Sequence, residues 1–185
     1  QAQLRQHDDS PQLIAYLKQR GLDGNTAKRW ELGYAPPEWD ALLKQFGQSD
    51  QQRQQLVQLG MLTRNDSGKL YDRFRGRLMF PIRDKRGKVC GFGGRVLAAD
   101  NGPKYLNSPE TPLFHKGLEL YGLHQLKQAN PQIEQVIVVE GYMDVVMLAE
   151  HGVNNAVATL GTATTGEHVR KLLRVVDRVV FSFDG

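Results

Sequence analysis

The chain has 185 residues and a formal net charge of +4, with 40% hydrophobic and 24% charged residues. This length suffices for one ordinary domain or two small ones, each with a buried core. No apolar run approaches the roughly 20 residues of a membrane-spanning helix, and no secretory signal begins the chain, so we expect no membrane partner. Cys90 is the single cysteine, which excludes an internal disulfide or a cysteine zinc cluster and fits a reducing, cytoplasmic location.

Small packing helices are expected over the first sixty residues. Ser10-Pro11 is a typical helix start, with serine as the cap and proline in the first turn. We assign these helices no chemistry. Later ones are predicted around 26–31, then with Trp39, Leu42, Leu43 and Phe46, and then after the cap Ser49, where Leu56, Val57 and Leu59 should face inward.

Strand signals follow from Met61 onward. Residues 65–68 form a turn, and 78–82 and 89–96 form a hairpin around Asp84-Lys-Arg-Gly87. Glycines at 91, 93 and 94 indicate a bend in the second strand, or a close approach of its backbone to another group. The alternative is a nucleotide-binding glycine-rich loop. That loop would need the dinucleotide spacing and a following helix, so a bulged strand is favoured.

A helix near 117–129 leads to Asn130-Pro131, where we place a boundary between two subdomains. The first, 1–130, combines the helices with a basic β segment in a mixed α+β arrangement. The second, 131–185, has the pattern of a partial sheet of parallel strands. The predicted class of the whole chain is therefore α/β.

The second subdomain begins with a continuous β-branched run, Val136-Ile-Val-Val139. Such a run without alternation is typical of a strand buried on both faces. The pattern continues as helix, strand, helix and strand, and Thr164-x-x-Glu167 is a capping-box signature for the second helix. Right-handed crossovers in this β-α-β-α-β order should make the three strands parallel.

Two carboxylates follow the first and third of these strands. Glu140 comes directly after Val139, with Gly141 permitting a tight turn, and Asp184 follows the strand at 178–183. Parallel strands bring their carboxyl ends to one edge of a sheet, where open α/β sheets bind their ligands. Mg²⁺ takes a few carboxylates plus phosphate oxygens, so we expect Glu140 and Asp184 to form a metal site.

Cations are concentrated between residues 69 and 104, with aromatic side chains among them. This basic segment has ten Lys or Arg residues against Asp72, Asp84 and Asp100. Such a surface attracts polyanions, but a charged run is also the usual solvated face, so the pattern alone leaves both interpretations open. The cations at the hairpin tip, Lys85, Arg86 and Lys88, fit an ordinary surface.

Several motifs resemble those of one family. The run from Val138 to Val145, VVEGYMDV, then Leu160-Gly-Thr and the final Phe183-Asp-Gly are similar to the toprim domain of topoisomerases and primases. The resemblance covers nearly the whole chain from about Ser10. Upstream motifs resemble bacterial DnaG-type primases in the family's order: Tyr71-Asp-Arg-Phe-Arg, Met79-Phe-Pro-Ile-Arg-Asp, Gly91-Phe-Gly-Gly-Arg95, Lys104-Tyr-Leu-Asn-Ser-Pro-Glu-Thr111 and Phe114-His-Lys-Gly117.

This resemblance implies a fold and an activity. The fold is a mixed α+β N-terminal subdomain followed by a partial toprim domain, which is Rossmann-like. The activity is synthesis of RNA primers on a DNA template by nucleotidyl transfer assisted by Mg²⁺ or Mn²⁺, with Glu140 and Asp184 as the catalytic and metal residues. Nucleotide and template binding would fall to Arg73, Arg75, Arg95, Lys104, Tyr105, Asn107 and Lys116.

The same resemblance implies partners. These are a single-stranded DNA template, ribonucleoside triphosphates, the RNA primer and a replicative helicase, which would bind through a domain outside this chain. Guanosine alarmones are a further implied ligand, and zinc is implied only for a module that precedes this one in the parent protein. The family's pattern continues as Asp-x-Asp, whereas the sequence stops at Asp184-Gly185, so we expect this piece alone to be inactive.

Two other functions stay open on the sequence. Another toprim nuclease or topoisomerase would share the metal site, although Tyr142 lies in the turn after Glu140 and is a poor nucleophile for strand cleavage. A catalytically silent module for single-stranded nucleic acid would use the basic segment alone. Three roles also stay open. His115 is a general base, or a residue that packs or lies next to a phosphate. Asp144 is a carboxylate that supports the metal site without binding the metal, or a helix cap or surface residue. Thr162 is a source of backbone N–H groups for phosphate.

Overall fold

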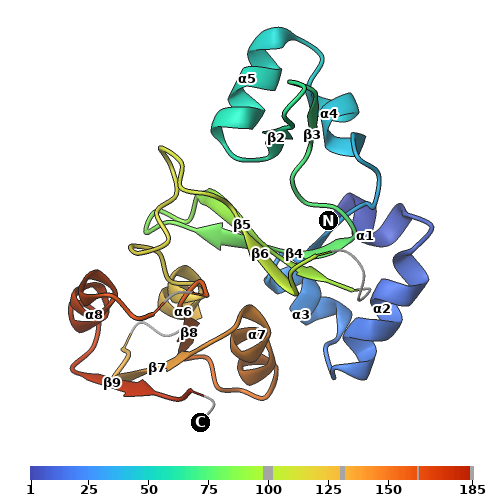
Figure 1. The fold of residues 1–185 in the computed structure, drawn as a ribbon. Coiled ribbons are helices and arrows are strands. Elements are labelled where there is room, and N and C mark those ends of the chain that lie inside the picture. Colours follow the sequence, from blue (N-terminus) through green and yellow to red (C-terminus); the bar gives the residue numbers. More distant parts are fainter. Residues whose placement is uncertain (98–101, 130–131, 162, 184–185) are drawn as a thin grey trace.

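The computed structural model describes residues 1–97, 102–129, 132–161 and 163–183 (Figure 1). In these ranges the strands form a four-stranded antiparallel sheet, a two-stranded antiparallel sheet and a three-stranded parallel sheet. The mixed α/β class predicted from the sequence is confirmed. Over the same ranges, no helix combines the length and the apolar character that a membrane crossing requires.

The four-stranded sheet lies at the centre of the molecule (Figure 1). Its spatial order is β1 (Gly33–Ala35), β4 (Arg77–Arg83), β5 (Val89–Val96) and β6 (Tyr105–Asn107). The predicted hairpin is therefore the β4–β5 pair. Leu78, Phe80 and Ile82 recur at every second position of β4 and are completely buried, as expected of one face of a pleated strand.

The glycines of β5 lie against aromatic rings. A Cβ atom on Gly91 would lie 2.8 Å from the ring of Phe114, and one on Gly93 would collide with the ring of Tyr142. The pairing of β4 with β5 also shifts register between Ile82 and Arg83. The bulged strand is thus confirmed, because these glycines admit core side chains and the next element among the described residues is the strand β6.

The first three helices pack beside this sheet. They are α1 (Ala2–Gln6), α2 (Ser10–Gln19) and α3 (Gly24–Arg29). Leu13 and Leu17 of α2 belong to the same buried cluster as the side chains of β4. The predicted cap was wrong by one residue: Asp9 occupies the N-cap position, where its side chain makes no bond to the helix start. Ser10 is the first residue of α2, and its hydroxyl donates to the Gln3 carbonyl at 3.3 Å.

A smaller lobe stands apart at the top of Figure 1. It contains α4 (Ala41–Phe46), α5 (Asp50–Gln58), β2 (Leu62–Arg64) and β3 (Leu70–Asp72). The inward orientation predicted for Leu56, Val57 and Leu59 was partly wrong, because Leu59 is 38% exposed while the other two are half-buried. Trp39 was predicted in a helix with Phe46 but precedes α4. Asp72 joins β3 to α4, because its buried carboxylate accepts the backbone N–H groups of Leu42 (2.6 Å) and Leu43 (3.0 Å).

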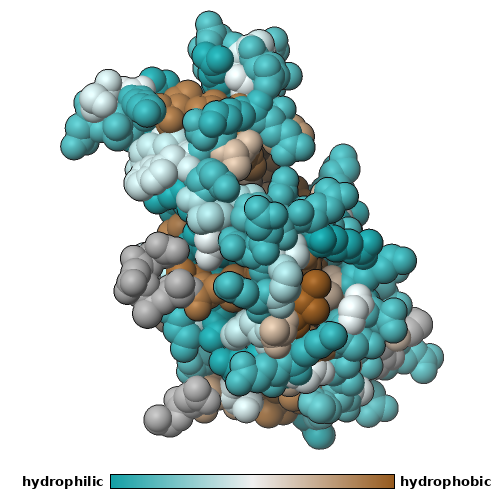
Figure 2. All heavy atoms as spheres, turned by 90° about the vertical axis from the view of Figure 1, so that its right-hand side faces the viewer, coloured by the Kyte–Doolittle hydropathy of each residue, from teal (hydrophilic) through white to brown (hydrophobic). Residues whose placement is uncertain are grey.

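Figure 2 shows a largely hydrophilic face, on which hydrophobic atoms appear only in separate patches. Scattered apolar surface of this kind is normal for a folded protein.

The parallel sheet has the predicted β-α-β-α-β order. It contains β7 (Gln135–Val139), α7 (Tyr142–Glu150), β8 (Ala156–Ala158), α8 (Gly166–Leu173) and β9 (Arg178–Phe181), and β7 is the central strand. The helix predicted over 117–129 is shorter, since only α6 (Leu123–Ala129) is helical. Residues before α6 form turns, in which Tyr121 makes an isolated bridge to Ala158.

Alternate residues of β7 enter two different cores. Val136 and Val138 pack with α6 and α8, whereas Ile137 and Val139 pack with α7 and the central sheet. This burial on both faces explains the continuous β-branched run. The capping box of α8 was predicted one residue too early: Thr165 is the N-cap, and His168 supplies the reciprocal side chain.

Candidate nucleotide and metal site

A cleft of about 690 Å³ lies where the parallel sheet meets the central sheet. It joins the carboxyl end of β7, the start of α7, β6 and the loop before α8. Its basic side chains come from the end of α2, from β5 and from just before β6, and its acidic ones from the end of β7 and the first turn of α7. Its charged and hydrogen-bonding lining includes Arg20, Arg95, Lys104, Tyr105, Asn107, Glu140 and Asp144.

Glu140 occupies the acidic side of the cleft. It directly follows the buried β7, its side chain is exposed, and no cation of the described residues pairs with its carboxylate. Asp144 lies one turn into α7, and its Oδ2 accepts the N–H of Gly141 at 3.0 Å. The structure therefore gives Asp144 a capping role while it also lines the cleft.

The predicted partner of Glu140 lies outside the described residues, since Asp184 is not among them, and Thr162 is not either. Phe183, which precedes Asp184, lines the same cleft as Glu140. Among the described residues no group of three or more His, Cys, Asp or Glu side chains could hold a metal ion. Glu140 and Asp144 nevertheless offer carboxylate oxygens, the ligand type that Mg²⁺ prefers, so the acidic side suits this ion.

Arg95 lies on the basic side, held between two tyrosines. Its guanidinium carbon is 5.0 Å from the ring centroid of Tyr16 and 5.8 Å from that of Tyr105, and only 9% of the residue is exposed. Stacking of this kind fixes a planar guanidinium in place. Its Nε is buried without a hydrogen-bond partner among the described residues.

Lys104 and Arg20 complete the basic side. The Lys104 ammonium lies 6.0 Å from the Tyr105 ring, and Arg20 reaches the cleft from the end of α2. The sequence analysis missed Arg20 because it assigned α2 a packing role. The signal was its i,i+4 spacing from Tyr16, over whose ring its guanidinium lies at 5.6 Å.

Asn107 joins three parts of the cleft. Its side-chain nitrogen donates to the carbonyl of Leu160 at 2.6 Å, and its side-chain oxygen accepts from the hydroxyl of Tyr142. The guanidinium of Arg73 donates to its backbone carbonyl at 3.2 Å. The Asn107 amide is therefore already engaged within the protein. Arg73 is not among the residues lining the cleft and supports Asn107 through this contact.

Tyr142 is unsuited to strand cleavage. It is 4% exposed, and burial raises the pKa of its hydroxyl well above the usual value near 10. A nucleophilic tyrosine needs access to the substrate and a route for its proton, and neither is compatible with this position.

Arg75 lies outside the cleft, in the smaller lobe. Its guanidinium carbon is 4.0 Å from the Trp39 ring centroid and 5.2 Å from that of Tyr71. Trp39 was missed as a binding residue because the sequence analysis assigned it only to a helix, whereas it precedes α4 and is 63% exposed. The result is an exposed cation–aromatic cluster, a surface on which a base or phosphate can rest.

Lys116 is likewise not among the cleft residues, and its loop lies beside the start of α8. The adjacent His115 has an exposed side chain, and its Nδ1 lies 2.9 Å from the Glu110 carboxylate. The hairpin-tip cations Lys85, Arg86 and Lys88 are exposed, as an ordinary surface requires.

Comparison with known proteins agrees with this geometry. The family described as "DNA primase catalytic core, N-terminal domain" matches residues 1–127, and the toprim domain family matches residues 134–185. The chain belongs to the DnaG-type DNA primase family. The resemblance drawn from the motifs is confirmed, and primase and toprim catalytic cores are in general metal-dependent.

Curated relatives in this family are DNA primases of bacteria. The primase of Pseudomonas putida is 56% identical over 183 residues, which cover 98% of this chain and 28% of that protein. The primase of Escherichia coli K12 is 56% identical over 170 residues, or 92% and 29% of the two chains. The chain thus spans less than a third of the length of these primases.

Solved primase structures share the fold. A DnaG primase catalytic domain bound to ssDNA has a TM-score of 0.92 and 52% identity, with 100% of this chain and 57% of that chain covered. A DNA primase domain from Pseudomonas aeruginosa has a TM-score of 0.94 and 54% identity, with 97% and 56% covered.

Proposed function

We propose that this chain is the part of a primase catalytic core that holds nucleotide, template and metal. In the full-length protein it would support DNA-templated synthesis of RNA primers for replication. One observation carries the proposal: the cleft combines Glu140 with Arg95, Lys104 and Arg20 in a chain of the primase family.

The charges of the cleft suit nucleoside triphosphates. Arg95 and Arg20 present guanidinium groups to phosphate oxygens, and Lys104 adds a point charge. Tyr105, 39% exposed, offers a ring to a base or sugar. Positioning and charge neutralisation dominate phosphoryl-transfer catalysis, so the site needs no side-chain nucleophile.

Glu140 and Asp184 are our proposed metal residues, with Asp144 as a neighbouring carboxylate. Mg²⁺ or Mn²⁺ bound there would supply a positive charge to align and neutralise the reacting phosphate. Lys116 and Asn107 complete the proposed set, Asn107 chiefly through the contacts that shape the cleft.

The template path extends towards the smaller lobe in this proposal. Arg73 and Arg75 provide charge, and Trp39 provides an exposed ring for base stacking. A related primase catalytic domain is named as bound to ssDNA, and another is named in complex with a DNA oligomer that has a six-nucleotide overhang.

The proposed role brings further partners and a location. The RNA primer would leave through the same surface, and the replicative helicase would bind a part of the full-length protein outside this chain. Guanosine alarmones carry the phosphates that the basic side of the cleft accepts, and are proposed as competing ligands. Zinc is proposed only for a separate module, and the place of action is the bacterial cytoplasm at the replication fork. We also propose the division into subdomains 1–130 and 131–185.

Assays with the full-length protein test this function and separate it from its two alternatives. Template-dependent incorporation of ribonucleotides that requires Mg²⁺ or Mn²⁺ is expected. Cleavage or relaxation of DNA without incorporation would assign another toprim activity. Binding of single-stranded DNA that needs neither metal nor nucleotides, again without incorporation, would assign a silent binding module.

A further inference from the structure

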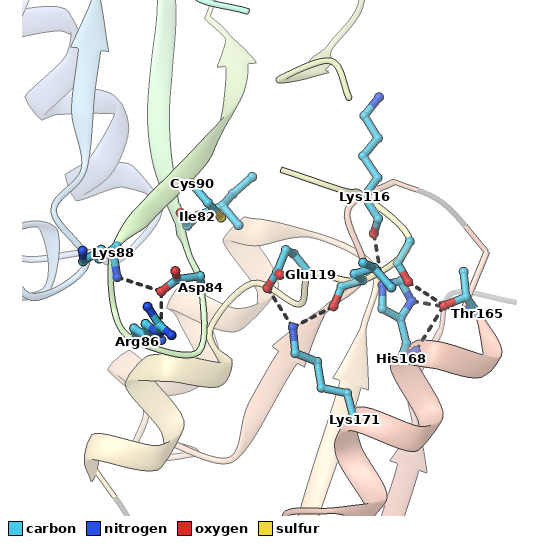
Figure 3. Close-up of polar contacts among 12 residues, drawn as sticks. Ile82, Asp84, Arg86, Lys88, Cys90, Lys116, Glu119, Thr165, His168 and Lys171 are labelled. Carbon is cyan, nitrogen blue, oxygen red and sulfur yellow. Dashed lines mark hydrogen bonds and ion pairs between the residues drawn. The ribbon is translucent and has the colours of Figure 1, made fainter. Parts of the chain in front are cut away.

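Three successive backbone carbonyls accept hydrogen bonds from side chains of α8 and its N-cap (Figure 3). Thr165 Oγ1 donates to Gly117 at 2.8 Å, His168 Nε2 to Lys116 at 3.0 Å, and Lys171 Nζ to Leu118 at 2.7 Å. The three donors are spaced by three residues, so they lie along one side of α8. We call Thr165, His168 and Lys171 the α8 clasp.

His168 is the buried centre of this clasp, with no exposed surface. A carbonyl can only accept, so Nε2 carries the proton that goes to Lys116. The N–H of Thr165 points at Nδ1 at 3.2 Å, so Nδ1 is the acceptor. Both contacts hold together only in the neutral Nε2–H tautomer.

A carboxylate holds the other side of the same peptide. Glu110 Oε1 accepts the N–H of Lys116 at 2.9 Å, while Glu110 Oε2 contacts His115. The N–H and the C=O of Lys116 are thus both fixed by side chains. In Figure 3 the Lys116 side chain extends away from the clasp, and its ammonium has no partner among the described residues.

We propose that His168 is a positioning residue that acts through Lys116. The α8 clasp fixes the backbone of residues 116–118, so the flexible side chain of Lys116 starts from one place and one direction. This limits the volume that the ammonium searches and favours its contact with a phosphate of nucleotide or template. The proposal rests on the proposed function, because it assigns the ligand of Lys116 to that reaction.

Two substitutions in the full-length protein separate the two contacts of His168. The amide nitrogen of His168→Gln can take the place of Nε2 and keep the bond to the Lys116 carbonyl. His168→Asn can replace only Nδ1, so it keeps the acceptor for Thr165 and loses the bond to Lys116. We expect His168→Gln to retain primer synthesis and His168→Asn to lower kcat/KM about tenfold, because small displacements of a positioning group are costly.

A double-mutant cycle with Lys116→Ala measures whether the effects of the two residues on kcat/KM are coupled. A purely structural role of His168 would produce no such coupling. In the Lys116→Ala background, His168→Asn should cause no further loss of kcat/KM, although its effect on the melting temperature persists. An equal tenfold loss in both backgrounds, or equal loss from His168→Gln and His168→Asn, would overturn the proposal. If His168→Asn does not fold, Lys171→Gln at the partly exposed end of the clasp replaces it in the same cycle.

The outcome for the clasp is separable from that for the function. If the wild-type protein makes no primers under any metal condition, the proposed function fails. In that case the affinity for single-stranded DNA is measured over a series of salt concentrations for wild type, His168→Asn, Lys116→Ala and the double variant. Loss of affinity from His168→Asn only when Lys116 is present would support the clasp, and absence of that coupling would overturn it.

Discussion

The hydroxyl of Tyr142 donates a hydrogen bond to the side-chain oxygen of Asn107, and this contact connects the first turn of α7 with the end of β6. The Asn107 side chain also donates to the Leu160 carbonyl, so it connects β6 of the central sheet with α7 and with the loop before α8. The shape of the cleft therefore depends on a buried hydroxyl from outside the basic segment.

Substitution of Tyr142 by Phe should remove this contact and keep the ring packing. We expect a loss of about 1 kcal/mol in the free energy of unfolding, since an acceptor is left unpaired, and a weaker affinity for nucleotide. Urea denaturation and nucleotide titration measure the two effects. Tyr121→Phe is the matched control, because its buried hydroxyl has no partner among the described residues and its removal should cost little. Equal losses from both variants would contradict this account.

Glu140→Gln should abolish primer synthesis in the full-length protein and leave fold and template affinity nearly unchanged. The carboxylate is exposed, and no described cation pairs with it, so the substitution would remove the proposed metal ligand without breaking an internal contact. Primer yield over a range of Mg²⁺ concentrations is the measurement, with the exposed Glu134→Gln as control. Near-normal yield from Glu140→Gln would take this residue out of the metal site.

Lys116→Ala should reduce activity far more than Lys85→Ala. Both side chains can reach solvent. The backbone of Lys116 is fixed on two sides, because its N–H donates to Glu110 and its carbonyl accepts from His168. If Lys116 contacts a template phosphate, its loss should also lower the slope of log affinity against log salt by about one unit. Small and equal effects of the two substitutions would indicate a diffuse basic surface.

Gly93→Ala should destabilise the protein by about 1–3 kcal/mol, because its Cβ would collide with the Tyr142 ring in a packed core. The control is Gly166→Ala at the start of α8, where nothing lies within 4 Å of the added atom. Chemical denaturation should show a loss for the first variant and little change for the second. Nucleotide affinity should fall with Gly93→Ala, since Tyr142 shapes the cleft.

His168 should make stability depend on pH. Burial lowers the pKa of its imidazole below the usual value of 6.5, with Lys171 adding to the decrease and Glu119 opposing it. The unfolded chain therefore binds a proton more readily, and the free energy of unfolding should fall as the pH drops below 6.5. Above 6.5 the contribution is fully present.

Comparison of wild type with His168→Gln isolates this effect from other titrating groups. The stability advantage of wild type, measured by urea denaturation, should shrink between pH 7.5 and pH 5.5. A constant difference over that range would mean that His168 does not carry the predicted titration.

Sequence alone predicted the elements that depend on local pattern. The β-branched run predicted β7 correctly, because a strand with both faces buried needs apolar residues at every position. The end of that strand correctly predicted that Glu140 would line the cleft. The capping box of α8 was misplaced because an imidazole performs the task usually given to Glu or Gln. Arg20 was missed although its i,i+4 spacing from Tyr16 was visible, because its place in the cleft depends on residues distant in sequence. Trp39 was missed because its contact with Arg75 joins segments that are far apart in the chain.

The division of β7 between two cores has a consequence for how this site can change. A slip of one residue would exchange the side chains that fill both cores, so packing fixes the register of the strand along its length. The packing of β7 sets the position of Glu140, whose exposed side chain takes no part in that packing. The acidic position can therefore be substituted without penalty to folding, and the same sheet can be adapted to different chemistries by changing the residues at its rim.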